Sequence, residues 1–268
     1  MINNDRRINV PLPRTAHDDT ISSPRLLTLT PTACIAGRDQ SQRMKRGETE
    51  RADRPRLSVR IMLRFSKSRY LDGLWIGTWE TEAEPILHRI EEALLLIKRY
   101  DRIRYDRLLH DLQRVWVLLL PWSLASFENR TYRCEIDTRF CLAETTTPEL
   151  LAAVIVHEAT HARLWRRGIR YEEAQRPRIE EICLRREIAF GAKLPNGEAV
   201  RDQAERTLGL CATGEYWTSA AFRERYIEGG VEILRYVGAP DWLARVFRWL
   251  LVKRGCIRRG LARLKRAA

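Results

Sequence analysis

The sequence predicts an α+β fold, in which a small N-terminal sheet and one buried helix are followed by a mostly helical C-terminal part. Strand-like runs lie between residues 57 and 140, whereas helical periodicity extends from about residue 176 to the C-terminus. Between them, residues 148–166 form a long apolar helix pattern that also contains ionisable residues. A hydrophobic content of 44% over 268 residues is sufficient for a core of this kind.

Strands are predicted for four segments. Residues 57–65 alternate between apolar and polar side chains, which is typical of a strand with one buried face. Residues 74–79, which follow an Asp-Gly pair, are expected to pair with this strand across a long hairpin loop. Residues 115–120 are apolar throughout and predict a buried strand, whereas residues 132–140 alternate as in an exposed edge strand.

Helices are predicted before and after this central region, from apolar periodicity and from turn residues at the segment ends. They cover residues 85–113, with a break near Tyr100-Asp101, then 176–190, 198–210 and 218–237, and a last helix that begins at 239–241.

The chain divides by composition into three parts. Residues 1–56 mix polar, charged and proline residues without any period, so we expect a mostly disordered basic segment. Residues 57–240 are expected to form the folded domain. Residues 241–268 predict a basic amphipathic helix that packs on this domain or extends from it.

The apolar pattern over residues 148–166 has clear end signals. Thr147 is a natural N-cap, Pro148 fits the first helical position, and Gly168 is expected to end the helix. Residues 150–156 carry no charge, so most of this helix is expected to be buried. Ionisable residues that follow on the same helix therefore enter the interior.

His157, Glu158 and His161 form an H-E-x-x-H motif in the middle of this helix. The two histidines lie one turn apart on one face, so both imidazoles can reach one tetrahedral metal ion. Glu158 projects about 100° away, as suits a carboxylate that takes a proton from metal-bound water. Buried ionisable groups are costly unless something compensates them, and Zn²⁺ would do so. The motif therefore predicts a zinc site, in preference to two chance histidines on an ordinary helix.

A catalytic zinc site usually has three protein ligands. None of the five histidines follows His161, so a carboxylate farther along the chain is expected. In the helix predicted over 176–190, Glu180 lies at the edge of the apolar stripe, whereas Glu181 points to the far side. Helical phase favours Glu180, and a shift of one residue in the helix would favour Glu181.

Residues 110–192 resemble the zincin metallopeptidase superfamily, specifically its gluzincin type. The resemblance rests on the H-E-x-x-H motif and on Glu180 and Glu181, whose distance from the second histidine falls within the spacing of this family. It implies Zn²⁺ bound by the two histidines and Glu180, the motif glutamate as general base, and hydrolysis of a peptide or protein substrate. Arg163 departs from the family pattern, in which that position is usually apolar.

Two other zincin groups are excluded by the residues after the motif. A metzincin would need a glycine at position 164 and a histidine at position 167, where this chain has Leu164 and Arg167. The SprT-like DNA-repair proteases would need a histidine at position 166, which is Arg166 here.

The resemblance also implies a residue that stabilises the oxyanion of the tetrahedral intermediate. Gluzincins often use a histidine or tyrosine beyond the third ligand, and here Tyr216 is the first choice, followed by Tyr226 and Tyr171. Zincins hold an extended substrate against an edge strand before the active-site helix, a role expected for residues 132–140. The alternative for this segment is a plain sheet edge that charged residues protect from pairing.

The chain is strongly basic, with a net charge of +13. From Arg245 onward there are nine basic residues and no acidic ones, interleaved with large apolar side chains. Such a helix can bind an anionic membrane surface, contact nucleic acid, or cap the core with its arginines turned outward. The alternative to a peptidase is therefore a metal-stabilised, non-catalytic scaffold whose C-terminal helix binds one of these partners.

The cysteine pattern and the hydropathy of the chain indicate where in the cell the protein is expected. The six cysteines form no C-x-x-C pair, which predicts neither a cysteine zinc site nor a disulfide framework. Cys134 and Cys141 are near enough in the sequence to bridge in an oxidising compartment, and in the cytosol they should be free thiols. No apolar run is long enough for a signal peptide or a transmembrane span. We expect a cytoplasmic protein, peripheral at the membrane at most.

Overall fold

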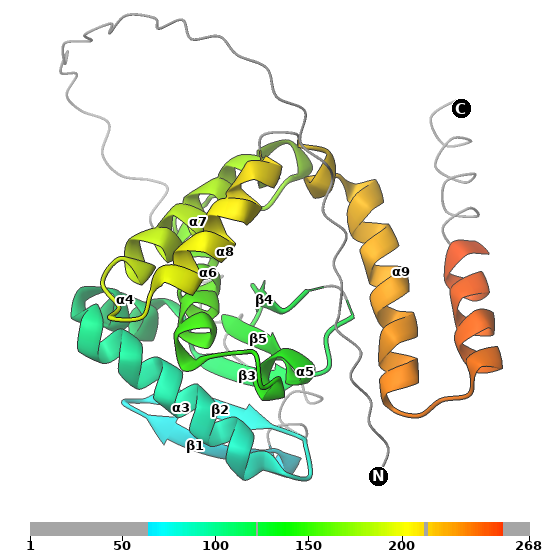
Figure 1. The fold of residues 1–268 in the computed structure, drawn as a ribbon, viewed down its shortest axis with the longest axis horizontal. Helices are drawn as coiled ribbons and strands as arrows, with labels where there is room; N and C mark the ends of the chain where they lie inside the picture. The colour runs from blue at the N-terminus through cyan, green and yellow to red at the C-terminus, as the bar shows by residue number, and fades with distance from the viewer. Residues whose placement is uncertain (1–63, 122, 212–213, 254–268) are drawn as a thin grey trace, which may run out of the picture. The chain divides into compact units, whose positions relative to one another are not determined.

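The computed structural model describes residues 64–121, 123–211 and 214–253, and these form an α+β fold (Figure 1). The predicted segment 1–56 lies outside the described residues. The strands are β1 (Lys67–Leu71), β2 (Leu74–Thr78), β3 (Arg114–Leu118), β4 (Ala125–Glu128) and β5 (Arg133–Asp137). They form one sheet in the order β1-β2-β3-β5-β4, with antiparallel pairs at both ends and parallel pairs in the middle.

Helices make up most of the chain after the sheet, so the predicted class of a small sheet followed by a mostly helical part is confirmed. A helix at 241–253 continues to the end of the described residues. The other helices are α3 (Ala83–Tyr100), α4 (Arg102–Asp111), α5 (Thr138–Leu142), α6 (Pro148–Arg166), η1 (Glu173–Gln175), α7 (Arg176–Gly191), α8 (Glu198–Cys211), η2 (Glu215–Trp217) and α9 (Ser219–Tyr236).

β1 and β2 form a tight hairpin around Asp72 and Gly73. Both residues have positive φ angles, 48° and 86°, as a two-residue type I′ turn requires. Pairing therefore begins directly at the turn, with Leu71 opposite Leu74.

The strand that pairs with β2 is not the predicted one. Residues 57–63 lie outside the described part of the chain, but Arg64 and Phe65 are helical, so the prediction for 57–65 is wrong at its end. β1 is the partner instead. It lies at an edge of the sheet with mostly exposed side chains, so no apolar alternation marks it in the sequence.

The strand predicted at the sheet edge is internal, which corrects the prediction for residues 132–140. β5 lies between β3 and β4 and is mostly buried. Its polar side chains are accommodated because Arg133 pairs with Glu135 and stacks over Trp116 at 4.9 Å. The sheet edge next to β5 is formed by β4, which is only four residues long and half-buried. Neither length nor apolar pattern marks such a strand in the sequence.

The predicted helix over 85–113 is broken where the sequence indicates. α3 ends before Asp101, whose carboxylate accepts a hydrogen bond from the backbone N–H of Arg104 at 3.2 Å and so caps α4.

The main core lies between one face of the sheet and helices α3 and α6. The α6 residues before and around the H-E-x-x-H motif belong to this core, so the middle of α6 is held in place on one side by apolar packing. Strand side chains that reach the same core are Leu74, Ile76, Val115, Val117, Cys134 and Ile136.

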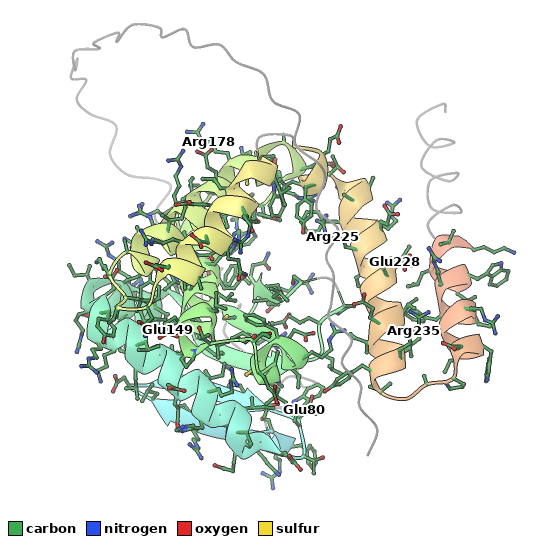
Figure 2. The ribbon with its side chains drawn as sticks, viewed as in Figure 1. Glu80, Glu149, Arg178, Arg225, Glu228 and Arg235 are labelled. Carbon is green, nitrogen blue, oxygen red and sulfur yellow. The ribbon has the colours of Figure 1, made fainter. Side chains whose placement is uncertain are left out.

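α9 and the helix at 241–253 lie side by side (Figure 1). The ring of Phe247 lies over Gly230 of α9, and Glu228 reaches across to Arg248 at 2.7 Å (Figure 2). By contrast, Trp242 and Trp249 are 60% and 55% exposed. Within the described residues, no helix combines the length and the apolar character needed to cross a bilayer.

Candidate metal centre

α6 begins and ends where the sequence predicts. The Oγ atom of Thr147 accepts a hydrogen bond from the backbone N–H of Leu150 at 3.3 Å, and Pro148 occupies the first turn. Gly168, with a φ angle of 83°, follows the last turn. The motif residues therefore lie in the third and fourth turns, after a buried apolar segment that packs on α3.

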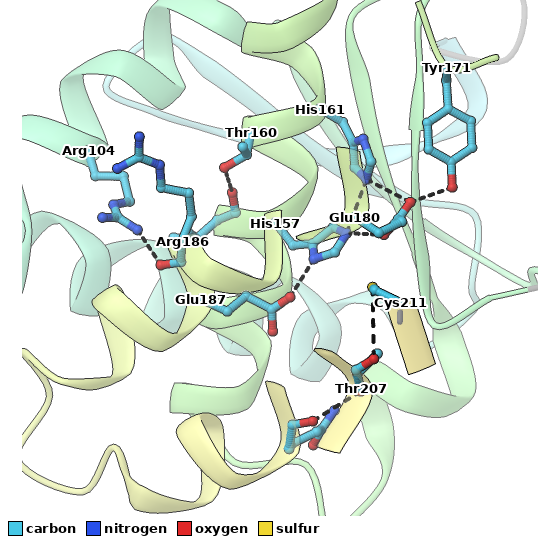
Figure 3. Close-up of polar contacts among 12 residues, drawn as sticks. Arg104, His157, Thr160, His161, Tyr171, Glu180, Arg186, Glu187, Thr207 and Cys211 are labelled. Atoms are coloured by element: carbon cyan, nitrogen blue, oxygen red, sulfur yellow. Dashed lines mark hydrogen bonds and ion pairs between the residues drawn. The ribbon is translucent and has the colours of Figure 1, made fainter. Parts of the chain in front are cut away.

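Three side chains from α6 and α7 converge (Figure 3). The Nε2 atom of His157 is 3.1 Å from Nε2 of His161 and 3.1 Å from Oε2 of Glu180. Nε2 of His161 is 3.4 Å from Oε1 of Glu180. In a tetrahedral zinc site with ligands at roughly 2.0–2.1 Å, neighbouring ligand atoms are about 3.3–3.4 Å apart. The three donors are therefore spaced as one metal ion requires.

Glu181 takes no part in this convergence. Its side chain is 41% exposed and pairs with Arg185 at 2.7 Å, one turn along the outer face of α7. The structure thus brings Glu180, rather than Glu181, to the two histidines, as the apolar stripe of this helix indicates.

Glu187 contacts the other ring nitrogen of His157. The imidazole Nδ1 donates to Oε1 of Glu187, which lies two turns beyond Glu180 on α7 (Figure 3). A carboxylate in this position fixes the orientation of a histidine and keeps Nδ1 protonated when Nε2 binds a metal. Glu187 therefore orients His157 toward the place where the three donors meet.

The centre holds an excess of buried acidic groups, since Glu158, Glu180 and Glu187 are all buried. Burial alone would raise the pKa of Glu180, but His161 and His157 outweigh it and lower that pKa below its ordinary value. Burial likewise disfavours protonated His157, but Glu187 and Glu180 raise its pKa well above the ordinary value. The carboxylates that attract a proton also favour a metal cation in its place. The nitrogen and oxygen donors suit Zn²⁺.

Glu158 is buried near the two histidines. It is 6% exposed, and no hydrogen bond or ion pair of its carboxylate is found among the described residues. Burial raises its pKa above the ordinary value, while the nearby His161 and His157 oppose this shift. An unpaired carboxylate with a raised pKa beside a metal position is suited to accept a proton.

Tyr171 is the tyrosine that the structure brings to the centre. Its hydroxyl donates to Oε1 of Glu180, and its ring meets the ring of His161 edge-on at 5.4 Å. Burial, followed by the charge of Glu180, raises the pKa of Tyr171, so the phenol remains a hydrogen-bond donor.

The other two predicted tyrosines lie on η2 and α9. Tyr216 is on η2, where its ring packs on Trp217 and lies 3.9 Å from the guanidinium of Arg225. No contact of Tyr216 with the metal centre is found in the described part of the chain. Tyr226 is on α9 and lines a pocket to which Tyr171 also contributes.

Cys183 is a further donor near the histidines. Its Sγ atom and one nitrogen each of His157 and His161 lie within 4.8 Å of one another. The thiol is free and buried, and burial, followed by Glu180, raises its pKa. Glu180, with its carboxylate oxygens 3.1 Å and 3.4 Å from the two histidine nitrogens, lies at the spacing that a third ligand needs. Cys183 completes an alternative donor set.

Comparisons of the chain with protein-family models, with curated proteins and with solved structures found no match. The chemistry of the centre therefore rests on its geometry. Two imidazoles and a carboxylate can hold a divalent cation, Glu187 orients one imidazole, and Glu158 can accept a proton beside it.

Replacing Glu187 with Gln should weaken zinc binding by about 10- to 100-fold, as is typical when a carboxylate behind a metal-binding histidine is lost. Gln can still accept the hydrogen bond from His157, but it lacks the charge that raises the basicity of the imidazole. Competition with a fluorescent zinc chelator measures the affinity. Glu181→Gln is the matched control on the exposed face of α7. Equal zinc affinities for the two variants would show that Glu187 does not contribute to zinc binding.

Proposed function

We propose that this protein is a zinc-dependent peptidase of the gluzincin type. His157, His161 and Glu180 hold the zinc ion, and Glu158 is the general base. The observation that carries the proposal is the convergence of three donors, spaced at 3.1–3.4 Å, beside the buried carboxylate of Glu158, which makes no hydrogen bond or ion pair with the described residues.

His157, His161 and Glu180 would hold the ion, which would lower the pKa of a water molecule toward about 7. Glu158 would accept a proton from that water as the water oxygen adds to the carbonyl carbon, and would pass the proton to the amide nitrogen as the C–N bond breaks, so that the products are a carboxylate and an amine. Glu187 keeps His157 oriented throughout. Tyr171 contacts Glu180 through its hydroxyl, so it is our candidate donor for the carbonyl oxygen that becomes negatively charged, the role that the sequence assigned first to Tyr216.

β4 offers a place for the substrate backbone. It ends the sheet order and contacts α6, the helix that carries the motif. An edge strand pairs with an extended peptide through main-chain hydrogen bonds, which depend little on the peptide sequence. We therefore propose that β4, rather than residues 132–140, holds the extended substrate.

Metal removal tests the proposal directly. Zinc-loaded protein is incubated with a peptide mixture, and new termini are identified by mass spectrometry. We expect cleavage that stops with 1,10-phenanthroline and returns when zinc is added. Cleavage that persists after complete metal removal would contradict a metal-dependent reaction.

A second candidate function is a metal-stabilised scaffold without catalysis. Cys183 favours it, because a thiolate added to His157, His161 and Glu180 would complete four protein ligands and leave no position for water. In that case zinc would raise the thermal stability of the protein, yet the zinc-loaded protein would cleave no peptide.

We also propose that the helix at 241–253 binds an anionic membrane surface rather than nucleic acid. Exposed indole rings of Trp242 and Trp249 lie on the same short helix as Arg245, and Lys253 lies over the Trp249 ring at 4.0 Å. Indoles beside cations suit the interface between lipid headgroups and acyl chains.

Replacing Trp249 with Ala should weaken binding to phosphatidylserine vesicles roughly tenfold, because the indole would leave the lipid interface. Co-sedimentation at several salt concentrations measures the binding, which should weaken as salt rises. Trp79→Ala, which removes an exposed indole elsewhere, should have no effect. Binding to duplex nucleic acid without binding to vesicles would contradict the membrane assignment.

A further inference from the structure

A pocket of about 480 Å³ adjoins the metal centre. Tyr171 connects the two, because it lines the pocket and contacts both Glu180 and His161. A group bound in the pocket would therefore lie one side chain away from the donors. The pocket is lined by Tyr171, Arg176, Ser219, Phe222, Arg223 and Tyr226.

Arg176 is held rigidly at this pocket. Its Nη1 atom donates to the backbone oxygen of Trp217 at 3.2 Å and to Oγ of Ser219 at 3.1 Å. Its guanidinium lies 5.5 Å from the ring centre of Tyr171 and 4.9 Å from that of Phe222. Two aromatic rings close to the guanidinium restrict its movement without neutralising its charge.

The charge of Arg176 has no acidic partner within ion-pair distance among the described residues. Both hydrogen-bond acceptors are neutral, and its Nε atom is buried without a partner. The two oxygens of Glu173 accept from the backbone N–H and the hydroxyl of Ser219, at 2.8 Å and 2.7 Å, and these hydrogen bonds are the main reason that the pKa of Glu173 is lowered, with a smaller contribution from Arg176. A half-buried guanidinium whose charge is not neutralised by a nearby carboxylate attracts an anionic ligand.

Arg223 adds a second cation. It extends from α9 into the same lining, and no ion pair of Arg223 is found within the part of the chain described by the structure. A lining with two guanidinium groups and three aromatic rings matches a carboxylate on an apolar stem. A guanidinium binds a carboxylate through two parallel hydrogen bonds, and the rings bury the stem.

We propose that this pocket binds a carboxylate of the peptide substrate, so that cleavage occurs close to an acidic side chain or to a free C-terminus. The inference rests on the proposed peptidase function, since it names the substrate class of the same centre. Arg176 makes the charged contact, Arg223 supports it, and Tyr171, Phe222 and Tyr226 contact the stem.

Peptide hydrolysis by the zinc-loaded full-length protein tests the specificity. One peptide is made with Glu, Gln or Lys near the cleaved bond, each as the free acid and as the C-terminal amide. We expect kcat/KM for a carboxylate-bearing peptide to exceed that of its neutral counterpart by roughly tenfold, the effect of one charge-assisted hydrogen bond. Preference for Glu identifies a side-chain carboxylate, and preference for the free acid over the amide identifies the C-terminal one. Equal rates for all peptides would overturn the inference and leave the peptidase function intact.

Variants assign the preference to the pocket. Arg176→Gln should abolish the preference for a carboxylate, and Arg176→Lys should retain much of it. Arg223→Gln should reduce the preference while the hydrogen bonds of Arg176 to Trp217 and Ser219 stay in place. Arg225→Gln is the control, because this arginine stacks on Tyr216 and does not line the pocket. A preference unchanged in both Arg176→Gln and Arg223→Gln would place the recognition elsewhere.

A binding experiment separates the inference from the proposed function. Calorimetry with 3-phenylpropanoate and with 3-phenylpropanamide compares a carboxylate with its neutral amide on the same apolar stem. We expect the acid to bind the wild type roughly tenfold more tightly than the amide, and equally weakly once Arg176 is Gln. This result without peptide cleavage would support the pocket while the peptidase function fails. No difference between acid and amide would overturn the pocket assignment.

Discussion

Replacing Glu158 with Gln should leave one zinc ion per chain and lower peptide hydrolysis by about 100-fold or more, the range of a general base. Gln has nearly the same shape, so the buried position stays filled, but it cannot accept the proton from water. Glu158 makes no hydrogen bond or ion pair with the described residues, so little else is lost. Zinc content by mass spectrometry and kcat with a cleaved peptide measure the two effects separately.

Glu181→Gln is the control for this experiment. It removes the same charge from an exposed position on α7 and should keep both zinc and activity. An unchanged rate of hydrolysis in Glu158→Gln would show that Glu158 is not the general base. Loss of zinc in the same variant would instead make Glu158 a ligand.

Replacing His161 with Ala should abolish stoichiometric zinc binding, and hydrolysis with it. Two remaining protein ligands hold Zn²⁺ poorly, and the imidazole of His161 lies 3.1 Å from that of His157, at the point where the donors meet. Equilibrium dialysis with zinc measures the loss. The thermal stabilisation that zinc confers on the wild type should disappear in the variant as well.

His110→Ala is the matched control, since the side chain of His110 is 76% exposed on α4 and contacts Asp111. It should bind zinc as the wild type does. Retention of tight zinc binding by His161→Ala would show that the metal is held elsewhere.

Where local chemistry determines a structure, the sequence predicts it well. Thr147, Pro148 and Gly168 place the ends of α6, because capping hydrogen bonds and backbone angles depend on only a few neighbouring residues. The phase of Glu180 follows from the apolar stripe of α7, since only one face of that helix can be buried. The Asp-Gly pair at residues 72 and 73 marks a tight turn in the same way, but the expected long hairpin loop was wrong, because the partner strand was placed at residues 57–65 instead of β1.

Strand order could not be predicted in this way. Alternating polar residues in β5 could mean that one face of the strand is exposed, or that its polar side chains pair with each other inside the sheet. The ion pair of Arg133 with Glu135 shows that the second explanation holds. β4 has too few residues for any periodicity. Which strand lies at an edge depends on contacts that are distant in the sequence.

The sequence indicated that His157, His161 and Glu180 would converge, but it did not indicate the residues around them. Glu180, Cys183 and Glu187 are spaced at i, i+3 and i+7 on α7, which places all three on one helical face and was visible in the sequence. Tyr171 lies between α6 and α7, where no periodicity applies, so its contact with Glu180 could not be derived from spacing. Tyr216 was favoured by its position in the chain, whereas the packing of η2 on Trp217 and Arg225 decides where its ring lies.

The most direct test of the metal centre is zinc-edge X-ray absorption on the protein loaded with one zinc ion per chain. The assignment of His157, His161 and Glu180 predicts only nitrogen and oxygen ligands, at about 2.0–2.1 Å, with one position held by water. A sulfur ligand at about 2.3 Å would place Cys183 on the metal and contradict the open catalytic site. Failure of the intact protein to bind zinc at all would contradict the centre itself.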